Sequence, residues 1–159
     1  KELSKNTTML ESIKEFSQDN HPIYAECGGL MYLGEKLVDQ NENEYDMVGI
    51  LKGTSKMTKS LRRFGYCYGI AKEDTILSNV GGHEFHHSVF ESEEECAYIM
   101  KKERDKKIVD EWEGGYSKGN TLATYLHTHF YNNLNCIEKF LGKHQNDLNK
   151  EKLLVKEEN

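Results

Sequence analysis

The residue whose setting most favours chemistry is Cys27, within the segment Tyr24–Leu30. A short apolar run before it predicts a buried strand, and Gly28 and Gly29 after it let the backbone turn sharply. A thiol at such a bend points at a helix N-terminus, where backbone N–H groups and the helix dipole favour the thiolate. We therefore predict a cysteine nucleophile at a strand-to-helix elbow. A small buried cysteine in an ordinary turn is the alternative.

Two histidines, His127 and His129, follow the apolar run Leu122–Leu126. In a continuing strand their side chains share one face. A cysteine nucleophile needs a base that takes and returns a proton, and histidine titrates in the suitable range. His127 or His129 is the candidate base for Cys27, the other orienting it or lining the site. Surface histidines at a polar strand end are the alternative.

The segment His83–His87 matches HExxH, a zinc-hydrolase motif. That motif works on a helix, where its two histidines share one face and its glutamate is the base. Gly81 and Gly82 precede the segment, and no buried helical stripe accompanies it. We therefore expect a polar strand that lines a cleft, with His83, Phe85 and His87 on one face. A zinc hydrolase built on His83, Glu84 and His87 is the distant alternative.

The elements that must position these residues begin with a helix over Ser4–Ser17, capped by Ser4 or Asn6. A short strand over Pro22–Ala25 and a second helix from Leu30 to about Leu37 follow. A helix, a strand and a helix in close succession indicate an α/β fold. No linker, repeat or domain boundary is visible.

Further elements follow from the same patterns. Gly114–Gly115 and Gly119–Asn120 are expected to break the chain into a hairpin that feeds the strand before His127. The other expected elements are strands over residues 47–51, 64–70, 84–90 and 97–100 and a helix around residues 134–141. Residues 146–159 form a mostly charged tail that is expected to fray.

Composition excludes several classes of protein. The 159 residues carry a formal charge of −6, which argues against nucleic acid as the main partner. The absence of a long apolar run predicts no membrane span, and no export signal is visible. The four cysteines form no CxxC pair, so reduced thiols in the cytoplasm are expected. Cys67, Cys96 and Cys136 are interpreted as structural.

A local basic patch contrasts with the acidic balance of the whole chain. It reads either as a solvated loop or as a surface that faces an anionic ligand or a partner subunit. The sequence has no GxxxxGK[ST] phosphate loop, so it does not bind ATP by that route. The patch comprises Lys52, Lys56, Lys59, Arg62 and Arg63.

Four blocks in order resemble the cobyrinate a,c-diamide synthase type of glutamine amidotransferase. They are PIYAECGGLMYLG at 22–34, MT with LRRFGY within 57–66, GHEFHHS at 82–88 and GNTLATYLHTHF at 119–130. The resemblance covers residues 9 to about 142. The GHEF-H-S block favours the a,c-diamide synthase over the related cobyric acid synthase.

The resemblance implies a class I glutamine amidotransferase-like domain with a flavodoxin-like mixed sheet flanked by helices. Cys27 would attack the carboxamide of glutamine to form a γ-glutamyl thioester, and His127 would activate it. Water would then release glutamate, and ammonia would pass to an N-terminal ATP-binding domain. There ATP, with Mg²⁺, activates the a and c carboxylates of cobyrinate, a cobalamin precursor, for amidation.

The sequence also departs from the family pattern. The ATP-binding half and the N-terminal strands of the glutaminase domain are absent, so residues 1–145 are expected to form a partial glutaminase domain without a cofactor of its own. His129 stands where related triads carry an acid, so it is assigned only an orienting role. A nickel-sirohydrochlorin or cobyric acid synthase-type amidotransferase and a non-catalytic binding module are alternatives, and a homodimer is left open.

Overall fold

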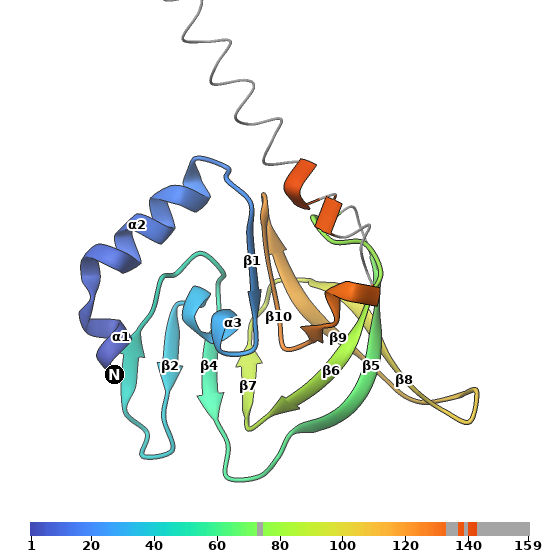
Figure 1. Ribbon diagram of the computed structural model, residues 1–159. Coiled ribbons are helices and arrows are strands. Elements are labelled where there is room, and N and C mark those ends of the chain that lie inside the picture. The colour runs from blue at the N-terminus through green and yellow to red at the C-terminus, as the bar shows by residue number, and fades with distance from the viewer. Residues whose placement is uncertain (73–74, 133–136, 139, 143–159) are drawn as a thin grey trace, which may run out of the picture.

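The structure, a computed structural model, describes residues 1–72, 75–132, 137–138 and 140–142 (Figure 1). Strands dominate this mixed α/β fold, and the predicted fold class is confirmed. The helices are α1 (Glu2–Lys5), α2 (Thr7–Gln18), α3 (Gly28–Leu33) and the short 3₁₀ helix η1 (Phe130–Asn132). The strands are β1 (Ile23–Glu26), β2 (Lys36–Val38), β3 (Glu44–Asp46), β4 (Thr54–Met57), β5 (Arg63–Ala71), β6 (Val80–His86), β7 (Ser88–Glu91), β8 (Cys96–Arg104), β9 (Lys107–Lys118), β10 (Thr121–Thr124) and β11 (His127–Thr128).

The described strands form two mixed sheets. One has seven strands in the order β1-β10-β9-β8-β5-β6-β11, and the other has four in the order β3-β2-β4-β7. In the larger sheet β1 pairs with β10 in parallel, and the other pairings are antiparallel. Because the carboxyl ends of parallel neighbours meet at one sheet edge, the residues that follow β1 and β10 are brought together there.

The first long helix is confirmed, and it divides into α1 and α2 at Asn6. The Asn6 side chain accepts a hydrogen bond from the backbone N–H of Met9 at 3.1 Å, so Asn6 rather than Ser4 caps α2. Leu10 and Ile13 pack against a buried cluster that includes Leu30 of α3. Figure 1 shows α2 and α3 beside β1, on the side of the smaller sheet.

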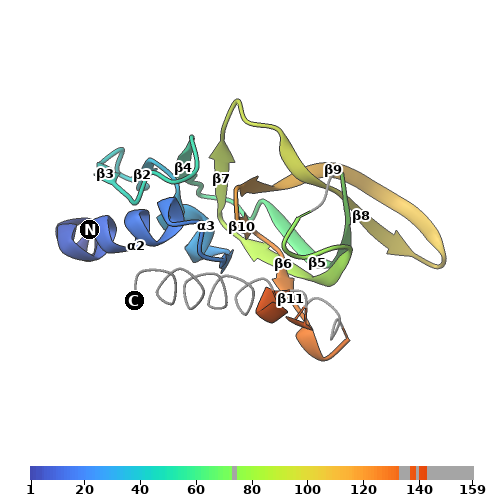
Figure 2. The ribbon, with the colours of Figure 1, turned by 90° about the horizontal axis from the view of Figure 1, so that it is seen from above.

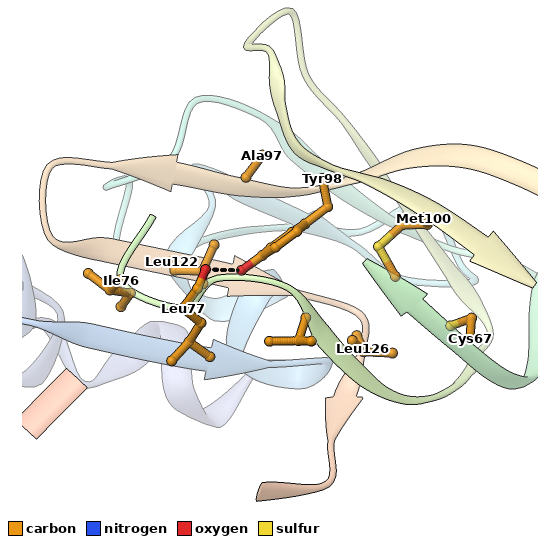
Figure 3. Close-up of a cluster of buried hydrophobic side chains, with 9 residues drawn as sticks. Cys67, Ile76, Leu77, Ala97, Tyr98, Met100, Leu122 and Leu126 are labelled. Atoms are coloured by element: carbon orange, nitrogen blue, oxygen red, sulfur yellow. Dashed lines mark hydrogen bonds between the residues drawn. The ribbon is translucent and has the colours of Figure 1, made fainter. Parts of the chain in front are cut away.

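Strand β10 separates two hydrophobic clusters. Leu122 belongs to a cluster with Tyr98 and Met100, drawn in Figure 3, whereas Ala123 belongs to the cluster around α3. The Tyr98 hydroxyl within the first cluster donates to the backbone carbonyl of Leu77 at 2.8 Å. All four residues of β10 are buried, as expected for a strand covered on both faces. The strand that leads to His127 is thus held by packing on each side.

Two predicted elements between residues 30 and 51 were wrong. The second helix ends at Leu33 instead of near Leu37, because Lys36–Val38 pairs between β3 and β4 as β2. The run Met47–Leu51 is largely buried but forms no strand. Its N–H groups instead donate to the last turn of α3, from Val48 to Tyr32 and from Ile50 and Leu51 to Leu33. This run therefore satisfies carbonyls that a helix end leaves without partners.

The predicted strands over residues 64–70 and 97–100 are confirmed within β5 and β8. The strand predicted over residues 84–90 divides at His87 into β6 and β7, which belong to different sheets.

The expected break at Gly114–Gly115 was wrong, because β9 continues through it. Gly115 has a φ of +68°, and a Cβ there would lie 2.7 Å from the Tyr98 ring, so glycine makes room for that ring. Gly119–Asn120 does form the turn before β10. The helix expected around residues 134–141 is helical at its described positions, but Leu134 and Cys136 lie outside the described residues.

Candidate active site

Cys27 lies at the sharp turn between the end of β1 and the start of α3 (Figure 1). Its φ of 49° is positive, a conformation that a residue with a Cβ adopts at an energetic cost. The Cys27 N–H donates to the carbonyl of Thr124 at 2.8 Å, which ties the turn to the end of β10. A Cβ at Gly29 would lie 2.9 Å from the Cβ of Ala25, so the tight turn requires glycine there. The predicted strand-to-helix elbow is confirmed as a backbone feature.

The electrostatic setting of Cys27 does not favour a resting thiolate. Burial is the largest effect and raises the pKa of the Cys27 thiol, whereas the N–H of Gly28 lowers this pKa. The charges of Glu26 and Glu84 raise it further. The expectation of a stabilised thiolate stays a prediction, since α3 has six residues and the charges of two carboxylates oppose the effect of the Gly28 N–H on the thiol. Nucleophilic attack at neutral pH then requires a neighbouring base.

His127 lies near the same sheet edge as Cys27. Glu26, the last residue of β1, is the register partner of Thr124, the last residue of β10, and His127 follows three residues later. It opens β11, which pairs with β6 through His83 (Figure 2). The His83 and His127 rings stack with their centroids 5.0 Å apart. The parallel pairing of β1 and β10 thus brings the segments of the predicted nucleophile and base together.

Glu26 was not singled out in the sequence, yet its carboxylate lies beside His127. Its Oε2 is 3.6 Å from Nδ1 of His127. Its Oε1 accepts hydrogen bonds from the Tyr24 hydroxyl at 2.8 Å and from the Thr128 N–H at 2.7 Å. The sequence does indicate that Tyr24 and Glu26 share one face of the strand before Cys27, because they are two residues apart.

Tyr24 joins Glu26 to β11 in a small polar network. Its hydroxyl oxygen lies 2.6 Å from Oγ1 of Thr128. Burial raises the pKa of Tyr24 far above its ordinary value, so this hydroxyl remains neutral and is available as a donor.

His129 lies farther along the same segment. Its backbone N–H donates to the carbonyl of Gly81 at 3.2 Å, and its ring meets Tyr131 edge-on with centroids 6.5 Å apart. The His127 side chain contacts His83 and Glu26. The orienting role of His129 stays a prediction.

A cavity of about 300 Å³ is lined by residues of β5, β6, β7 and β9. A buried acid–base pair is among the lining residues. Glu84 and His86 are 4% and 7% exposed, and Oε2 of Glu84 lies 3.3 Å from Nε2 of His86. Nδ1 of His86 lies 2.9 Å from the carbonyl oxygen of Ser88, and the ring stacks on Tyr125 with centroids 3.8 Å apart. The negative charge of Glu84 reaches Cys27, whose pKa it raises.

Two arginines from the basic patch also line this cavity. Arg62 and Arg63 both contribute to it. The Arg63 guanidinium lies 3.7 Å from the ring centroid of Trp112, and its Nη1 is 2.8 Å from Oδ2 of Asp110. Its Nε lies 4.0 Å from Oε2 of Glu84. The Arg63 side chain is therefore paired within the protein, and the anion-facing interpretation of the patch stays a prediction.

The structure contradicts the zinc alternative. The HExxH segment lies in β6 and the bend that follows it instead of a helix, with His83, Phe85 and His87 exposed and Glu84 and His86 buried. Its two motif histidines and Glu84 therefore point to different faces, as the strand interpretation predicted. In the part of the chain that the structure describes, no three His, Cys, Asp or Glu side chains are placed to hold a metal ion.

Two of the cysteines interpreted as structural are described. Cys67 is buried, and burial raises the pKa of its thiol to about 12. Cys96 is half-buried, and burial raises its pKa as well. Neither thiol lies at a turn like that of Cys27, and Cys136 lies outside the described residues.

A comparison with protein families identifies the class. Residues 1–134 match the CobB/CobQ-like glutamine amidotransferase domain. The chain therefore belongs to this family, and the mixed α/β fold described above is consistent with a glutamine amidotransferase-like domain. Among the described residues, no helix is long and apolar enough to cross a membrane.

Several curated bacterial proteins named cobyrinate a,c-diamide synthase are similar to the chain. The protein of Listeria monocytogenes serotype 4b is 54% identical over 145 residues, covering 89% of this chain and 32% of the relative. Those of Limosilactobacillus reuteri and Salmonella typhimurium are 51% and 43% identical, covering 88% and 89% of this chain and 32% of each relative. The chain thus spans about a third of the length of these relatives.

Proposed function

We propose that this chain is the glutaminase portion of a cobyrinate a,c-diamide synthase, with Cys27 as nucleophile and His127 as base. The observation that carries the proposal is the Cys27 elbow, tied to the end of β10 at the edge where His127 and Glu26 meet. The synthase part of the proposal rests on the similar proteins, which are named cobyrinate a,c-diamide synthase.

The proposed reaction begins with glutamine placed beside the elbow. As the Cys27 sulfur attacks the side-chain carboxamide carbon, its proton passes to Nε2 of His127. The tetrahedral intermediate collapses to a γ-glutamyl thioester when His127 returns that proton to the leaving nitrogen, which departs as ammonia. Water, deprotonated by His127, then attacks the thioester and releases glutamate and the Cys27 thiol. Burial raises the pKa of Cys27, so removal of its proton by His127 would favour the first step.

The arginines that line the cavity suit the other end of the substrate. Glutamine carries an α-carboxylate, and Arg62 and Arg63 line the cavity. Arg63 already contacts Glu84 and Asp110, so Arg62 is the cation that we assign to this carboxylate. We propose this cavity as the amino-acid subsite.

The synthase half-reaction is proposed for the part of the relatives that lies beyond the match. There ATP, with Mg²⁺, would activate the cobyrinate carboxylates that ammonia amidates. The sequence has no GxxxxGK[ST] phosphate loop, and we derive no step through ATP for the residues of this chain. Transfer of ¹⁵N from amide-labelled glutamine to cobyrinate by the longer protein tests this assignment, and transfer to nickel-sirohydrochlorin instead would contradict it. A cytoplasmic location and a homodimer stay predictions.

The glutaminase assignment can be tested on the chain itself with 6-diazo-5-oxo-norleucine, an electrophilic analogue of glutamine. We expect a single adduct on Cys27 by peptide mass mapping, with protection by excess glutamine. Cys27→Ser should abolish the adduct, and the matched control Cys96→Ser should keep it. Labelling of Cys67 or Cys96 in place of Cys27 would refute the proposal.

A further inference from the structure

We propose that Glu26 is the positioning residue for His127, supplying the carboxylate that the sequence pattern around His129 does not. This inference rests on the proposed function of Cys27 and His127. It assigns a role to a residue that stands next to the nucleophile, on a different strand from the base.

The two oxygens of the Glu26 carboxylate have different surroundings. Oε1 accepts two hydrogen bonds, from the Tyr24 hydroxyl and the Thr128 N–H. These bonds fix the plane of the carboxylate and leave Oε2 facing Nδ1 of His127 at 3.6 Å. The Thr128 contact also ties Glu26 to the residue that follows His127. The orientation of the carboxylate is therefore set by the same short strand that carries the histidine.

This geometry favours the histidine tautomer that the reaction needs. A carboxylate only accepts hydrogen bonds, so a closer approach of Oε2 would favour the form of His127 that carries a hydrogen on Nδ1. Nε2 is then the acceptor and can take the proton of Cys27. The distance of 3.6 Å is that of an ion pair, and such contacts commonly shorten when substrate binds.

Other groups near His127 cannot take this role. His83 packs flat against the ring and therefore does not meet the ring edge where Nδ1 lies. Glu84 lies on the buried face of β6, where it contacts His86 of the same strand and Arg63 of β5. Within the described part of the chain, Glu26 is the carboxylate in ion-pair contact with His127.

The charge of Glu26 has opposite effects on the two catalytic groups. It opposes the Cys27 thiolate, whose pKa it helps to raise. It favours the imidazolium that forms once His127 has taken the proton. Removing the charge should therefore slow reactions that need the base but not reactions of a preformed thiolate, whereas a merely structural role would slow both.

The experiment compares Glu26→Gln with the parent chain and with Glu11→Gln, an exposed helix position. At pH 7 we expect Glu26→Gln to slow labelling of Cys27 by diazo-oxo-norleucine by about 10²–10⁴-fold, with a shifted pH profile. Alkylation of Cys27 by iodoacetamide at alkaline pH should stay equal or become faster. Glu11→Gln should match the parent in both reactions.

Tyr24→Phe gives an independent test, because it removes one anchor of Oε1 and keeps the charge. We expect a roughly tenfold slower labelling, and this variant decides the matter if Glu26→Gln does not fold. Labelling by Glu26→Gln within twofold of the parent, or an equal loss in both reactions with unchanged melting, would overturn the positioning role. If the parent itself is not labelled on Cys27, the proposed function fails instead.

Discussion

Two carboxylate–histidine pairs lie near the nucleophile, and their surroundings differ. Glu26 and His127 are half-exposed, with side chains 26% and 37% accessible and 3.6 Å between Oε2 and Nδ1. Glu84 and His86 are nearly sealed, at 5% and 6%. Both ring nitrogens of His86 face acceptors, the Ser88 carbonyl and the Glu84 carboxylate. A buried histidine with a partner at both ring nitrogens is suited to a structural role. A histidine with a partner at one ring nitrogen keeps the other nitrogen for proton transfer.

The largest expected difference between the pairs concerns catalysis. His127→Gln should slow labelling of Cys27 by diazo-oxo-norleucine by about 10²–10⁴-fold, because the thiol loses its base. Thermal stability should change little, since the side chain is partly exposed. Labelling rates and melting curves, compared with those of the exposed control His87→Gln, provide the measurement. Parent-like labelling by His127→Gln would remove the distinction between the two pairs.

For the free energy of unfolding, the larger effect is expected at the Glu84–His86 pair. Glu84→Ala leaves the buried His86 without its carboxylate and should cost about 3–5 kcal/mol in the free energy of unfolding. Glu26→Ala breaks a half-exposed pair and should cost no more than about 1–2 kcal/mol, including two lost hydrogen bonds. Urea denaturation of both variants measures the difference. Equal costs would show that burial does not separate the pairs.

A glycine pair in β6 allows His127 to be disturbed without touching either carboxylate. A Cβ on Gly82 would collide with the backbone carbonyl of His127, whereas a Cβ on Gly81 meets nothing within 4 Å. Gly82→Ala should therefore displace β11 and slow Cys27 labelling at least about tenfold, a loss of about 1.4 kcal/mol in transition-state stabilisation. Gly81→Ala should retain the parent rate. Equal labelling by the two variants would mean that the pairing of β11 with β6 does not position the histidine.

The smallest expected effect is the pH dependence of thiol alkylation. Burial and two carboxylates raise the pKa of Cys27, so iodoacetamide alkylation should rise with pH and reach its midpoint above the ordinary value of about 8.5. Cys67, with a pKa of about 12, should react later. Because these thiols bind protons more tightly in the folded chain, the free energy of unfolding should be unaffected below the unfolded pKa and should fall as pH rises from there through the raised folded pKa. Rapid alkylation of Cys27 at pH 6 would contradict this setting.

The turn that carries Cys27 and the strand that precedes His127 could be predicted because each depends on local sequence. Cys27 is followed by two glycines at the end of an apolar run, and His127 ends another. The pattern of β6 was equally local, since alternation separates His83 from Glu84. Predicting these features requires only the two-residue period of a strand and the residue preferences of a turn.

The partners of these residues could not be predicted, because they depend on pairing between distant segments. Glu26 meets His127 only through the parallel register of β1 with β10, about a hundred residues apart in the sequence. Arg63 reaches Glu84 through the pairing of β5 with β6. The helix end at Leu33 was missed for a similar reason, since β2 forms only with β3 and β4 beside it.

The central claim is that Cys27 forms a thioester with the side chain of glutamine. The direct measurement is to incubate the chain with glutamine and hydroxylamine, which intercepts a γ-glutamyl thioester as the hydroxamate. The account predicts γ-glutamyl hydroxamate from the parent chain, its loss in Cys27→Ser and a strong reduction in His127→Gln. Hydroxamate formation that persists in Cys27→Ser would contradict the account.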